Sequence, residues 1–329
     1  MVNLRFNGGV YDCHTSETVL EALLRHEVAV PYSCRNGVCM TCMLHAVRGH
    51  VPSAAQHGIK KTLRVGGYFM ACVCRPERDL DLALPDDADV YGRAVVRAIE
   101  RLAPTICRVV LEPATPLYYR PGQFINLRRD DGLVRSYSLA SVPRRDRFLE
   151  IHVKRLPGGA MCNWVFDELE PGDAFDIQGP NGSCFYVPGQ PKQRMLLVGN
   201  GSGLAPLMGI FRDALQSRHT GDIHLYHGSR HREGLYLGDS LRRLAAQHAN
   251  FRYVPCLSGD KVSAGCRAGR ADVNAFSDHP DLWGWRVFLC GYPPMVHAAK
   301  KTAYLAGAGL SELHADPFEL RDLRHTPRD

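Results

Sequence analysis

The segment YSCRNGVCMTC, residues 32–42, places Cys34, Cys39 and Cys42 at C-x4-C-x2-C spacing. Two further cysteines, Cys72 and Cys74, follow in the segment FMACVC, and either could supply a fourth ligand. This spacing is typical of plant-type 2Fe–2S clusters, in which one tight loop supplies three of the four thiolates. We therefore predict a 2Fe–2S cluster in the N-terminal part of the chain.

The residues between these cysteines also suit a cluster. Gly37 allows the backbone to approach closely, so that amide N–H groups can point at the cluster sulfur atoms. Arg35 adds a positive charge beside a group that gains negative charge on reduction. The main alternative is a structural zinc site, but zinc sites are usually built from paired C-x2-C motifs, which do not match this spacing.

Length and composition limit the classes of protein to consider. The chain has 329 residues, of which 45% are hydrophobic, and this length predicts two or three domains. The net charge of +6 is spread along the sequence, whereas nucleic-acid binding would require a concentrated basic stripe. The N-terminus lacks the apolar core of a signal peptide, and no apolar run reaches about 18 residues, so we expect a soluble cytoplasmic protein. In that compartment the twelve cysteines are more consistent with metal ligands or buried thiols than with disulfides.

The pattern of apolar residues and turns divides the chain into three regions. Residues 1–88 read as a small mixed α and β unit. Residues 89–190 contain short β-like runs separated by Pro-Gly turns, which predicts a small antiparallel barrel. Residues 191–329 alternate strand-like and helix-like segments, which predicts a parallel α/β sheet.

The first region contains one clear helical stretch and ends in a linker. We expect a helix over VLEALLRH (19–26), with Thr15 or Ser16 as its N-terminal cap. The segment LPDDADVYG (84–92) is acidic and rich in turn-forming residues, which is typical of a connection between domains.

A glycine-rich segment in the third region indicates a phosphate site. GNGSGLAP (199–206) follows the apolar strand MLLV and opens a helix, so its backbone N–H groups could meet a pyrophosphate. Gly201 and Gly203 would permit close approach where a side chain would clash. Taken alone, the segment could equally be a packing turn between a strand and a helix.

Four motifs in a fixed order point to a known family. RSYS (135–138), KRLPGGAMCNW (154–164), GNGSGLAP and CGYPPM (290–295) occur in the order found in the ferredoxin–NAD(P)H reductase superfamily. Together with the N-terminal cysteine motif, the chain resembles the single-chain reductase components of bacterial ring-hydroxylating dioxygenases over residues 1–318. Soluble di-iron monooxygenase reductases look similar.

The resemblance implies three domains and a complete cluster ligand set. The domains are an α+β, β-grasp-like 2Fe–2S ferredoxin domain over residues 1–88, an antiparallel β-barrel FAD domain over 89–190, and an α/β parallel-sheet NAD(P)H-binding domain over 191–329. The family places its fourth cysteine in an LAC or LTC context, here MAC, which selects Cys72 over Cys74.

The resemblance also implies an FAD-binding set. Arg135 would bind the pyrophosphate, Tyr137 would stack on the flavin, and Ser138 would bond near the flavin N5. The alternative is that RSYS is simply an alternating strand. Family members usually have Ser or Thr in place of Cys162, so this side chain is expected to contribute little. The full FAD set is Arg135, Ser136, Tyr137, Ser138, His152, Val153, Lys154, Gly159, Ala160, Met161 and Cys162.

A nicotinamide-binding set follows in the same way. Cys290 would position nicotinamide for hydride transfer, and Phe318 would cover the flavin face until nicotinamide displaces it. Without the surrounding motifs, Cys290 would read as a buried thiol and Phe318 as a core residue. With Ser138, these two form the predicted catalytic group. The full nicotinamide set is Gly201, Ser202, Gly203, Ser229, Arg230, Cys290, Gly291, Met295 and Phe318.

The sequence gives a weak indication of whether the protein prefers NADH or NADPH. The segment SRHR (229–232) after the second strand of the third region is basic, which would tolerate the 2′-phosphate of NADPH. Similar segments occur in NADH-using relatives of this family. We therefore expect NADH, with NADPH as a usable alternative.

These parts imply an electron-transfer function. NADH would pass a hydride to FAD, and single electrons would then pass through the 2Fe–2S cluster to the terminal component of an aromatic ring-hydroxylating dioxygenase, or to its ferredoxin. The alternatives are a reductase for a soluble di-iron monooxygenase, a reductase of deoxysugar biosynthesis, and a redox-sensing module without turnover. We expect neither nucleic acid nor a membrane as a partner.

The surface that meets the electron acceptor is only partly indicated. Residues 1–88 contain nine Lys and Arg and nine Asp and Glu, so charge alone does not predict docking. Val38, Met40 and Met43 lie next to the cysteines and are candidates for docking, although they could equally pack within the loop.

Overall fold

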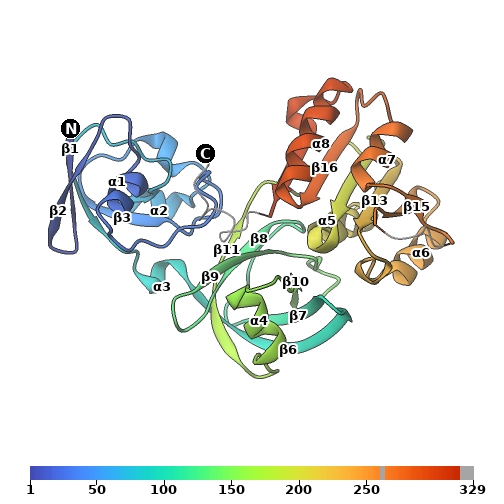
Figure 1. Ribbon diagram of the computed structural model, residues 1–329, viewed down its shortest axis with the longest axis horizontal. Helices are drawn as coiled ribbons and strands as arrows, with labels where there is room; N and C mark the ends of the chain where they lie inside the picture. The colour runs from blue at the N-terminus through green and yellow to red at the C-terminus, as the bar shows by residue number, and fades with distance from the viewer. Residues whose placement is uncertain (260–263, 319–329) are drawn as a thin grey trace.

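The computed structural model describes residues 1–259 and 264–318, which form three β-sheets with helices around them (Figure 1). The sheets follow one another along the chain, so each is built from one stretch of sequence. None of the described helices is long and apolar enough to cross a membrane. The arrangement has the fold class predicted from the sequence.

The N-terminal unit is a five-stranded sheet packed against a short helix. Its elements are β1 (Val2–Phe6), β2 (Gly9–Cys13), α1 (Val19–Arg25), β3 (Met43–Arg48), α2 (Lys61–Val65), β4 (Tyr68–Met70) and β5 (Leu80–Ala83). The strand order is β2-β1-β5-β3-β4, in which only β1 and β5 are parallel. Val19, Leu20 and Leu23 of α1 are buried in the core that the sheet covers. The cysteine loop runs between α1 and β3.

The cap of α1 differs from the prediction. Thr18 is the N-cap: its Oγ1 accepts a hydrogen bond from Glu21 N, and the Glu21 carboxylate accepts one from Thr18 N at 2.8 Å. These two bonds form a capping box. The prediction of Thr15 or Ser16 was wrong because the residues before Thr18 form a turn of their own, closed by a separate backbone hydrogen bond.

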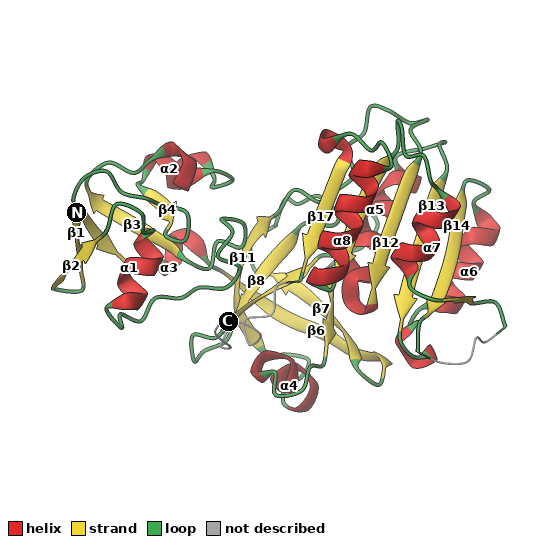
Figure 2. Ribbon diagram, turned by 45° about the horizontal axis from the view of Figure 1, so that its top comes forward, coloured by secondary structure: helices red, strands yellow, loops and turns green. Residues whose placement is uncertain are grey.

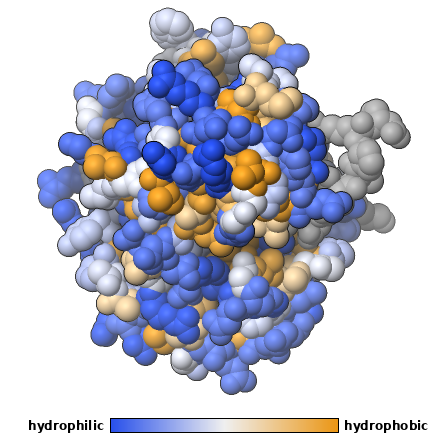
Figure 3. Space-filling view, turned by 90° about the vertical axis from the view of Figure 1, so that its left-hand side faces the viewer, coloured by the Kyte–Doolittle hydropathy of each residue, from blue (hydrophilic) through white to orange (hydrophobic). Residues whose placement is uncertain are grey.

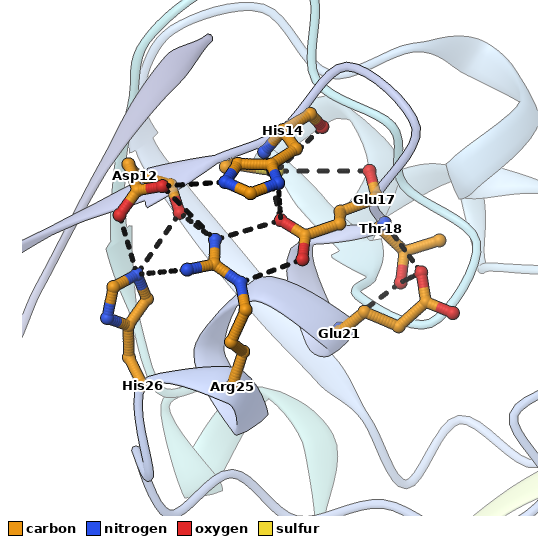
Figure 4. A network of polar contacts seen from close by, with 8 residues as sticks. Asp12, His14, Glu17, Thr18, Glu21, Arg25 and His26 are labelled. Atoms are coloured by element: carbon orange, nitrogen blue, oxygen red, sulfur yellow. Dashed lines mark hydrogen bonds and ion pairs between the residues drawn. The ribbon is translucent and has the colours of Figure 1, made fainter.

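A network of charged side chains holds α1 against β2 (Figure 4). Arg25 donates to both carboxylate oxygens of Glu17, at 2.8 and 2.9 Å, and its Nη2 also lies 3.2 Å from Asp12 Oδ2. His14 and His26 lie on either side of the Asp12 carboxylate, at 3.1 and 2.9 Å. The bond from Arg25 lowers the pKa of Glu17 to about 2, so Glu17 is ionised near neutral pH. The network therefore fixes the position of α1, and with it the start of the cysteine loop that follows this helix.

The second unit is a closed antiparallel barrel. Its elements are β6 (Gly92–Ala103), β7 (Ile106–Pro113), β8 (Phe124–Arg128), β9 (Val134–Ser138), β10 (Leu149–Lys154), α4 (Ala160–Asp167) and β11 (Ala174–Asn181). The strand order is β10-β7-β6-β11-β8-β9. A bridge between Leu139 and Ile151 joins the two ends of this order and closes the barrel. Met161 and Val165 of α4 pack into the barrel core.

The third unit is a parallel sheet between two layers of helices (Figure 2). Its elements are β12 (Met195–Asn200), α5 (Leu204–Gln216), β13 (Ile223–Ser229), α6 (Gly238–Gln247), β14 (Phe251–Leu257), β15 (Arg267–Ala268), α7 (Ala271–Asp278), β16 (Arg286–Gly291), α8 (Pro293–Leu305) and β17 (Leu313–Pro317). The strand order is β15-β14-β13-β12-β16-β17, and all described pairs are parallel. Helices α5 and α6 share one hydrophobic core with the sheet, and α7 and α8 share another.

The predicted linker is folded and is tied to both of its neighbours. Part of it forms the short helix α3 (Asp87–Val90), which lies between the N-terminal unit and the barrel (Figure 1). Tyr68 of the N-terminal unit donates a hydrogen bond to Asp89 at 2.6 Å. Arg128 of the barrel donates one to Asp87 at the same distance. The domain boundary proposed from the sequence falls inside this helix.

Candidate cofactor site

The cysteine loop directs backbone amides at its own thiols. Cys34 N lies 3.3 Å from Cys39 Sγ, and the amides of Asn36 and Cys39 lie 3.4 and 3.3 Å from Cys34 Sγ. Gly37 has a φ of +70°, a conformation that glycine adopts without strain. The loop therefore presents donors to sulfur atoms, as expected for a site that carries a negatively charged cluster.

The four predicted ligands come together as two pairs. The Cys34 thiol lies next to that of Cys39, and the Cys42 thiol lies next to that of Cys72. Among the described residues no group of three or more side chains is arranged to hold a metal ion, so the thiols are grouped in twos. Two pairs of thiolates suit two irons, each of which needs two protein ligands. All four side chains are buried.

Two neighbouring residues support this interpretation. Thr41 Oγ1 is buried without a hydrogen-bond partner among the described residues, although it lies next to the Cys39 thiol. A sulfur atom of a cluster would satisfy such a hydroxyl. Cys74 is fully buried in the core of the N-terminal unit near Cys13, so its position favours a packing role.

The strand predicted to hold the flavin has two different faces. Ser136 and Ser138 of β9 pair with Asn126 and Phe124 of β8, so these four side chains share one face. Tyr137 points to the opposite face, where it packs against the barrel core, and burial raises the pKa of its hydroxyl. The RSYS motif is therefore an alternating strand, as its pattern indicated, and this does not conflict with a role in cofactor binding.

The start of α4 leaves backbone donors available. Gly159 is its N-cap and makes no side-chain capping bond. Gly158 has a φ of +69°, and no atom lies within 4 Å of the place where a Cβ would stand. The thiol of Cys162 is occupied elsewhere, because it lies 3.2 Å from both Leu156 N and the Gly159 carbonyl. An open helix N-terminus of this kind suits a pyrophosphate.

Several side chains of the predicted FAD set are buried inside the protein. The side chains of Val153, Met161 and Cys162 are buried in the barrel core, so only their backbone could contact FAD. His152 is also buried, with Nδ1 at 3.0 Å from Tyr236 Oη and Nε2 at 2.9 Å from Glu150. Its side chain ties the barrel to the third unit.

The predicted nicotinamide residues surround a cleft between the barrel and the third unit. The cleft has a volume of about 1040 Å³. Its lining includes seven members of the predicted set, namely Gly201, Ser202, Ser229, Arg230, Gly291, Met295 and Phe318, together with Lys154 of the predicted FAD set. Ligands of open parallel sheets bind at this place, beyond the carboxyl ends of the strands.

Gly203 and Cys290 lie behind the wall of this cleft. A Cβ on Gly203 would stand only 2.3 Å from the carbonyl oxygen of Cys290. The absence of a side chain therefore allows the glycine-rich turn to pack on the end of β16. The Cys290 thiol is fully buried, 3.8 Å from that of Cys184, and burial raises its pKa. Such a thiol stays protonated, which agrees with a positioning role and not with a nucleophile.

Ser138, Cys290 and Phe318 meet around a residue that the sequence analysis missed. Asp316 accepts a hydrogen bond from Ser138 Oγ at 2.7 Å and lies opposite Cys290 in the pairing of β16 with β17. Phe318 N donates to the Gly291 carbonyl at 2.8 Å, which holds the end of β17 beside the cleft. Burial raises the pKa of Asp316 to about 6. The segment HADPFE carried the only signal for Asp316, as the context of Phe318.

Lys154 lies at the junction between the two predicted sets. A Cβ on Gly201 would stand 3.3 Å from Lys154 Nζ, so the ammonium group lies over the glycine-rich turn. Burial lowers its pKa, and no carboxylate among the described residues forms an ion pair with it. A phosphate bound at this turn would supply the missing negative charge.

Replacing Lys154 by methionine is expected to weaken nicotinamide binding. Hydrogen bonds to charged groups contribute about 1.5–3 kcal/mol, so the KM for NADH should rise about tenfold or more, with kcat little changed. Steady-state reduction of ferricyanide would measure both constants. Lys300→Met, which removes an exposed lysine of α8 outside the cleft, is the matched control. An unchanged KM in Lys154→Met would contradict a phosphate contact.

Three family models match successive parts of the chain. A 2Fe-2S iron-sulfur cluster binding domain matches residues 5–77. An oxidoreductase FAD-binding domain matches residues 98–186, and an oxidoreductase NAD-binding domain matches residues 197–301. The first match supports a cluster over the zinc alternative.

Relatives of known activity match almost the whole chain. The reductase subunit of an aromatic O-demethylase from Amycolatopsis is 36% identical, over 93% of this chain and 95% of that protein. The ferredoxin–NAD(P)+ reductase component of the naphthalene 1,2-dioxygenase/salicylate 5-hydroxylase systems of Ralstonia is 32% identical, over 96% of both chains. The reductase component of phenol 2-monooxygenase from Pseudomonas is 33% identical, over 92% of this chain and 89% of that protein.

Solved structures share the same architecture. The crystal structure of a cytochrome P450 reductase from Amycolatopsis has a TM-score of 0.69 and 34% identity, covering 97% of this chain and 99% of that one. The ferredoxin reductase of carbazole 1,9a-dioxygenase has a TM-score of 0.66 and 24% identity, covering 96% and 98%. The second likeness concerns the fold alone.

Proposed function

Because the chain belongs to the single-chain reductase components of multicomponent oxygenases, we propose that it supplies electrons to the terminal component of an aromatic ring-hydroxylating dioxygenase, or to its ferredoxin. It is an NAD(P)H-dependent iron–sulfur flavoprotein oxidoreductase, and its cofactors are a 2Fe–2S cluster, FAD and NAD(H). The family membership gives no support to the alternative that the chain is a redox-sensing module without turnover.

The contacts made by one face of the strand pair β8–β9 carry this proposal. Ser138 of β9 donates a hydrogen bond to Asp316 of β17, two residues before the cleft residue Phe318, and it pairs with Phe124 of β8. Phe124 forms a small apolar cluster with Cys34 and Cys39. A flavin can accept two electrons together and release them singly, which a nicotinamide cannot do. A flavin held at β9 would therefore lie close both to the end of β17, beside the nicotinamide cleft, and to the cysteine loop.

The protein's own groups prepare this site in three ways. The start of α4 and the glycine-rich turn would bind phosphates through backbone N–H groups. Asp316 would hold the hydroxyl of Ser138 in one orientation beside the flavin N5. The closed barrel and the end of β17 would keep water away from the site of hydride transfer.

The names of the relatives narrow the candidate electron acceptors to a few classes of enzyme. They serve an aromatic O-demethylase, a naphthalene dioxygenase and a phenol monooxygenase, at 36%, 32% and 33% identity. Since these values are close together, an aromatic monooxygenase or demethylase is a second candidate acceptor. All of these relatives serve the oxidation of aromatic compounds. We also propose that the reductase is located in the cytoplasm.

One of the three residues predicted to dock the electron acceptor is exposed on the surface of the N-terminal unit. Val38 is 48% exposed, whereas Met40 and Met43 are buried in the core of the N-terminal unit. Two of the three candidates were therefore wrong, because their side chains pack inside the loop. The end view of the molecule in Figure 3 shows apolar residues scattered among polar ones.

Reconstitution with terminal components would test the proposed acceptor. The purified reductase would be mixed in turn with a ring-hydroxylating dioxygenase, a cytochrome P450 O-demethylase and a di-iron phenol hydroxylase. We expect NADH consumption coupled to aromatic product with the dioxygenase. Coupling with another component alone would reassign the acceptor, and coupling with none of them would contradict the aromatic oxygenase proposal.

Replacing Arg230 by alanine would test the expected preference for NADH. Arg230 lines the cleft beyond the end of β13, where the ribose of the adenosine binds in such sheets. Loss of its guanidinium should lower kcat/KM for NADPH about tenfold more than for NADH, because only NADPH carries a 2′-phosphate. The two values of kcat/KM would be measured with ferricyanide as acceptor. An equal effect on both cofactors would contradict a 2′-phosphate contact, and a wild-type preference for NADPH would contradict the choice of NADH.

A further inference from the structure

We propose that Asn126 is a positioning residue that holds the cluster loop against the flavin-binding strands and so sets the rate of electron transfer from flavin to cluster. The inference rests on the proposed function, because it concerns the step between its two redox groups. Neither the sequence motifs nor the names of the relatives assign a role to this residue.

The contacts of Asn126 cross the boundary between the N-terminal unit and the barrel. Its Nδ2 donates a hydrogen bond to the carbonyl oxygen of Cys39 at 2.6 Å, across 87 positions of sequence. The side chain is only 1% exposed. Cys39 is a predicted cluster ligand, so this bond reaches the backbone of the cluster site itself.

The rest of the network fixes the orientation of the Asn126 amide. Its Nδ2 also donates to Gln178 Oε1 at 2.6 Å, and its Oδ1 accepts from Ser136 Oγ at 2.6 Å. Gln178 is held in turn by Asn181, whose Nδ2 lies 2.9 Å from the same Oε1. Because the Cys39 carbonyl can only accept, Nδ2 must face it. Each polar atom of the Asn126 amide therefore has a partner, and a buried network of this kind is rigid.

The same residue touches the strand predicted to carry the flavin. Asn126 pairs with Ser136 of β9, two positions before Ser138. Phe124, on the same face of β8, packs against Cys34 and Cys39. Asn126 and Phe124 therefore form the layer between the flavin strand and the cluster loop. Asn126 supplies the polar anchor in this layer, and Phe124 supplies apolar contact.

Other contacts hold the two units together without reaching the cysteines. Lys60 Nζ donates to the Gly179 carbonyl at 3.2 Å, and α3 is tied to both units as described above. Loss of the Asn126 contact should therefore leave the units joined, while the cluster loop loses its fixed position. Such a change affects the distance and the coupling between the redox groups, on which the rate of electron transfer depends steeply.

The step is a simple electron transfer. One electron leaves the reduced flavin and one electron enters the oxidised cluster, and no covalent bond is formed or broken. Asn126 gains or loses no proton in this step. Its contribution is the position of the Cys39 backbone.

The test compares Asn126→Asp and Asn126→Leu with the wild-type holoenzyme. The aspartate would place an oxygen against the carbonyl oxygen of Cys39, and the leucine would remove the bond at similar size. Asn250→Asp is the matched control, because the Asn250 amide also donates to two backbone carbonyls, at 3.0 Å each, but lies in the third unit. Rapid mixing with NADH without oxygen would follow flavin bleaching and cluster reduction separately.

We expect cluster reduction to slow about tenfold or more in both Asn126 variants, with flavin bleaching within about twofold of wild type. In Asn126→Leu, which adds no charge, the equilibrium reduction potential and the paramagnetic resonance spectrum of the cluster should stay unchanged. Amide hydrogen exchange of the oxidised protein should increase in residues 34–42 of the Asn126 variants and not in the control.

Three results would contradict the account in different ways. Cluster reduction at the wild-type rate in both variants would overturn the role of Asn126. A slower rate in Asn126→Leu accompanied by a shifted cluster potential would also overturn it, because the residue would then act on the driving force and not on position. A wild-type cluster that NADH cannot reduce would refute the proposed function itself.

Discussion

Replacing Cys72 by alanine is expected to abolish electron delivery to one-electron protein acceptors while NADH still reduces the flavin. Cys72 is the partner of Cys42 in the second pair of thiols, so its loss leaves one iron without a complete ligand set. The flavin and nicotinamide sites lie in the barrel and the third unit, and they do not depend on this thiol. Cytochrome c reduction should therefore fall to background, while ferricyanide reduction is retained.

The neighbouring thiol provides a matched control for this experiment. Cys74 is fully buried, two residues away from Cys72, in the core of the N-terminal unit. Cys74→Ala should keep the cluster, its visible absorbance and its paramagnetic resonance signal on reduction. If Cys74→Ala lost the cluster and Cys72→Ala kept it, the assignment of the fourth ligand would be wrong.

Replacing Ser138 by alanine is expected to slow NADH-driven flavin reduction about 100-fold, the size of effect found when one preorganised hydrogen-bonding group is removed from a reacting centre. Ser138 Oγ donates its hydrogen to Asp316, which leaves an oxygen lone pair that would accept a hydrogen bond from the flavin N5 as hydride transfer places a hydrogen there. The cluster and its ligands are untouched by this change. Rapid mixing with NADH would measure the rate directly, and a rate within about threefold of wild type would contradict the role given to Ser138.

The same pair predicts a pH dependence. Asp316 has a pKa raised to about 6 by burial, so it is protonated below this pH and ionised above it. The ionised carboxylate can only accept a hydrogen bond, so it holds the Ser138 hydroxyl with its hydrogen turned toward Asp316. The protonated carboxyl can donate instead and does not fix this orientation. The rate of flavin reduction should therefore rise as the pH increases through about 6. Asp316→Asn should remove this inflection. A wild-type rate that is constant between about pH 5 and 7 would contradict the assignment.

The elements that the sequence predicted well are those with local signals. The C-x4-C-x2-C spacing places three thiols in one loop, and the turns between short strands predicted the barrel. The glycine-rich segment predicted the end of a parallel strand. In each case neighbouring residues carry the pattern, so no knowledge of distant contacts is needed.

The residues that the sequence analysis missed depend on distant contacts. Asp316 meets Ser138 across 178 positions, and Asn126 meets Cys39 across 87. In the sequence each is a single polar residue within a strand, and nothing near it in the sequence identifies the distant residue that it contacts. The motifs also do not tell which way a side chain points: His152 and Met161 lie within predicted cofactor segments, and their side chains make a domain contact or pack into the barrel core. A strand or helix has several faces, and a motif does not tell which one the cofactor meets.

Anaerobic titration of the purified protein with NADH, followed by visible absorbance and electron paramagnetic resonance, tests the central claim most directly. The account predicts that the flavin bleaches and that the signal of a reduced 2Fe–2S cluster then develops, since both groups lie on one path. Bleaching of the flavin without any cluster signal would contradict that path.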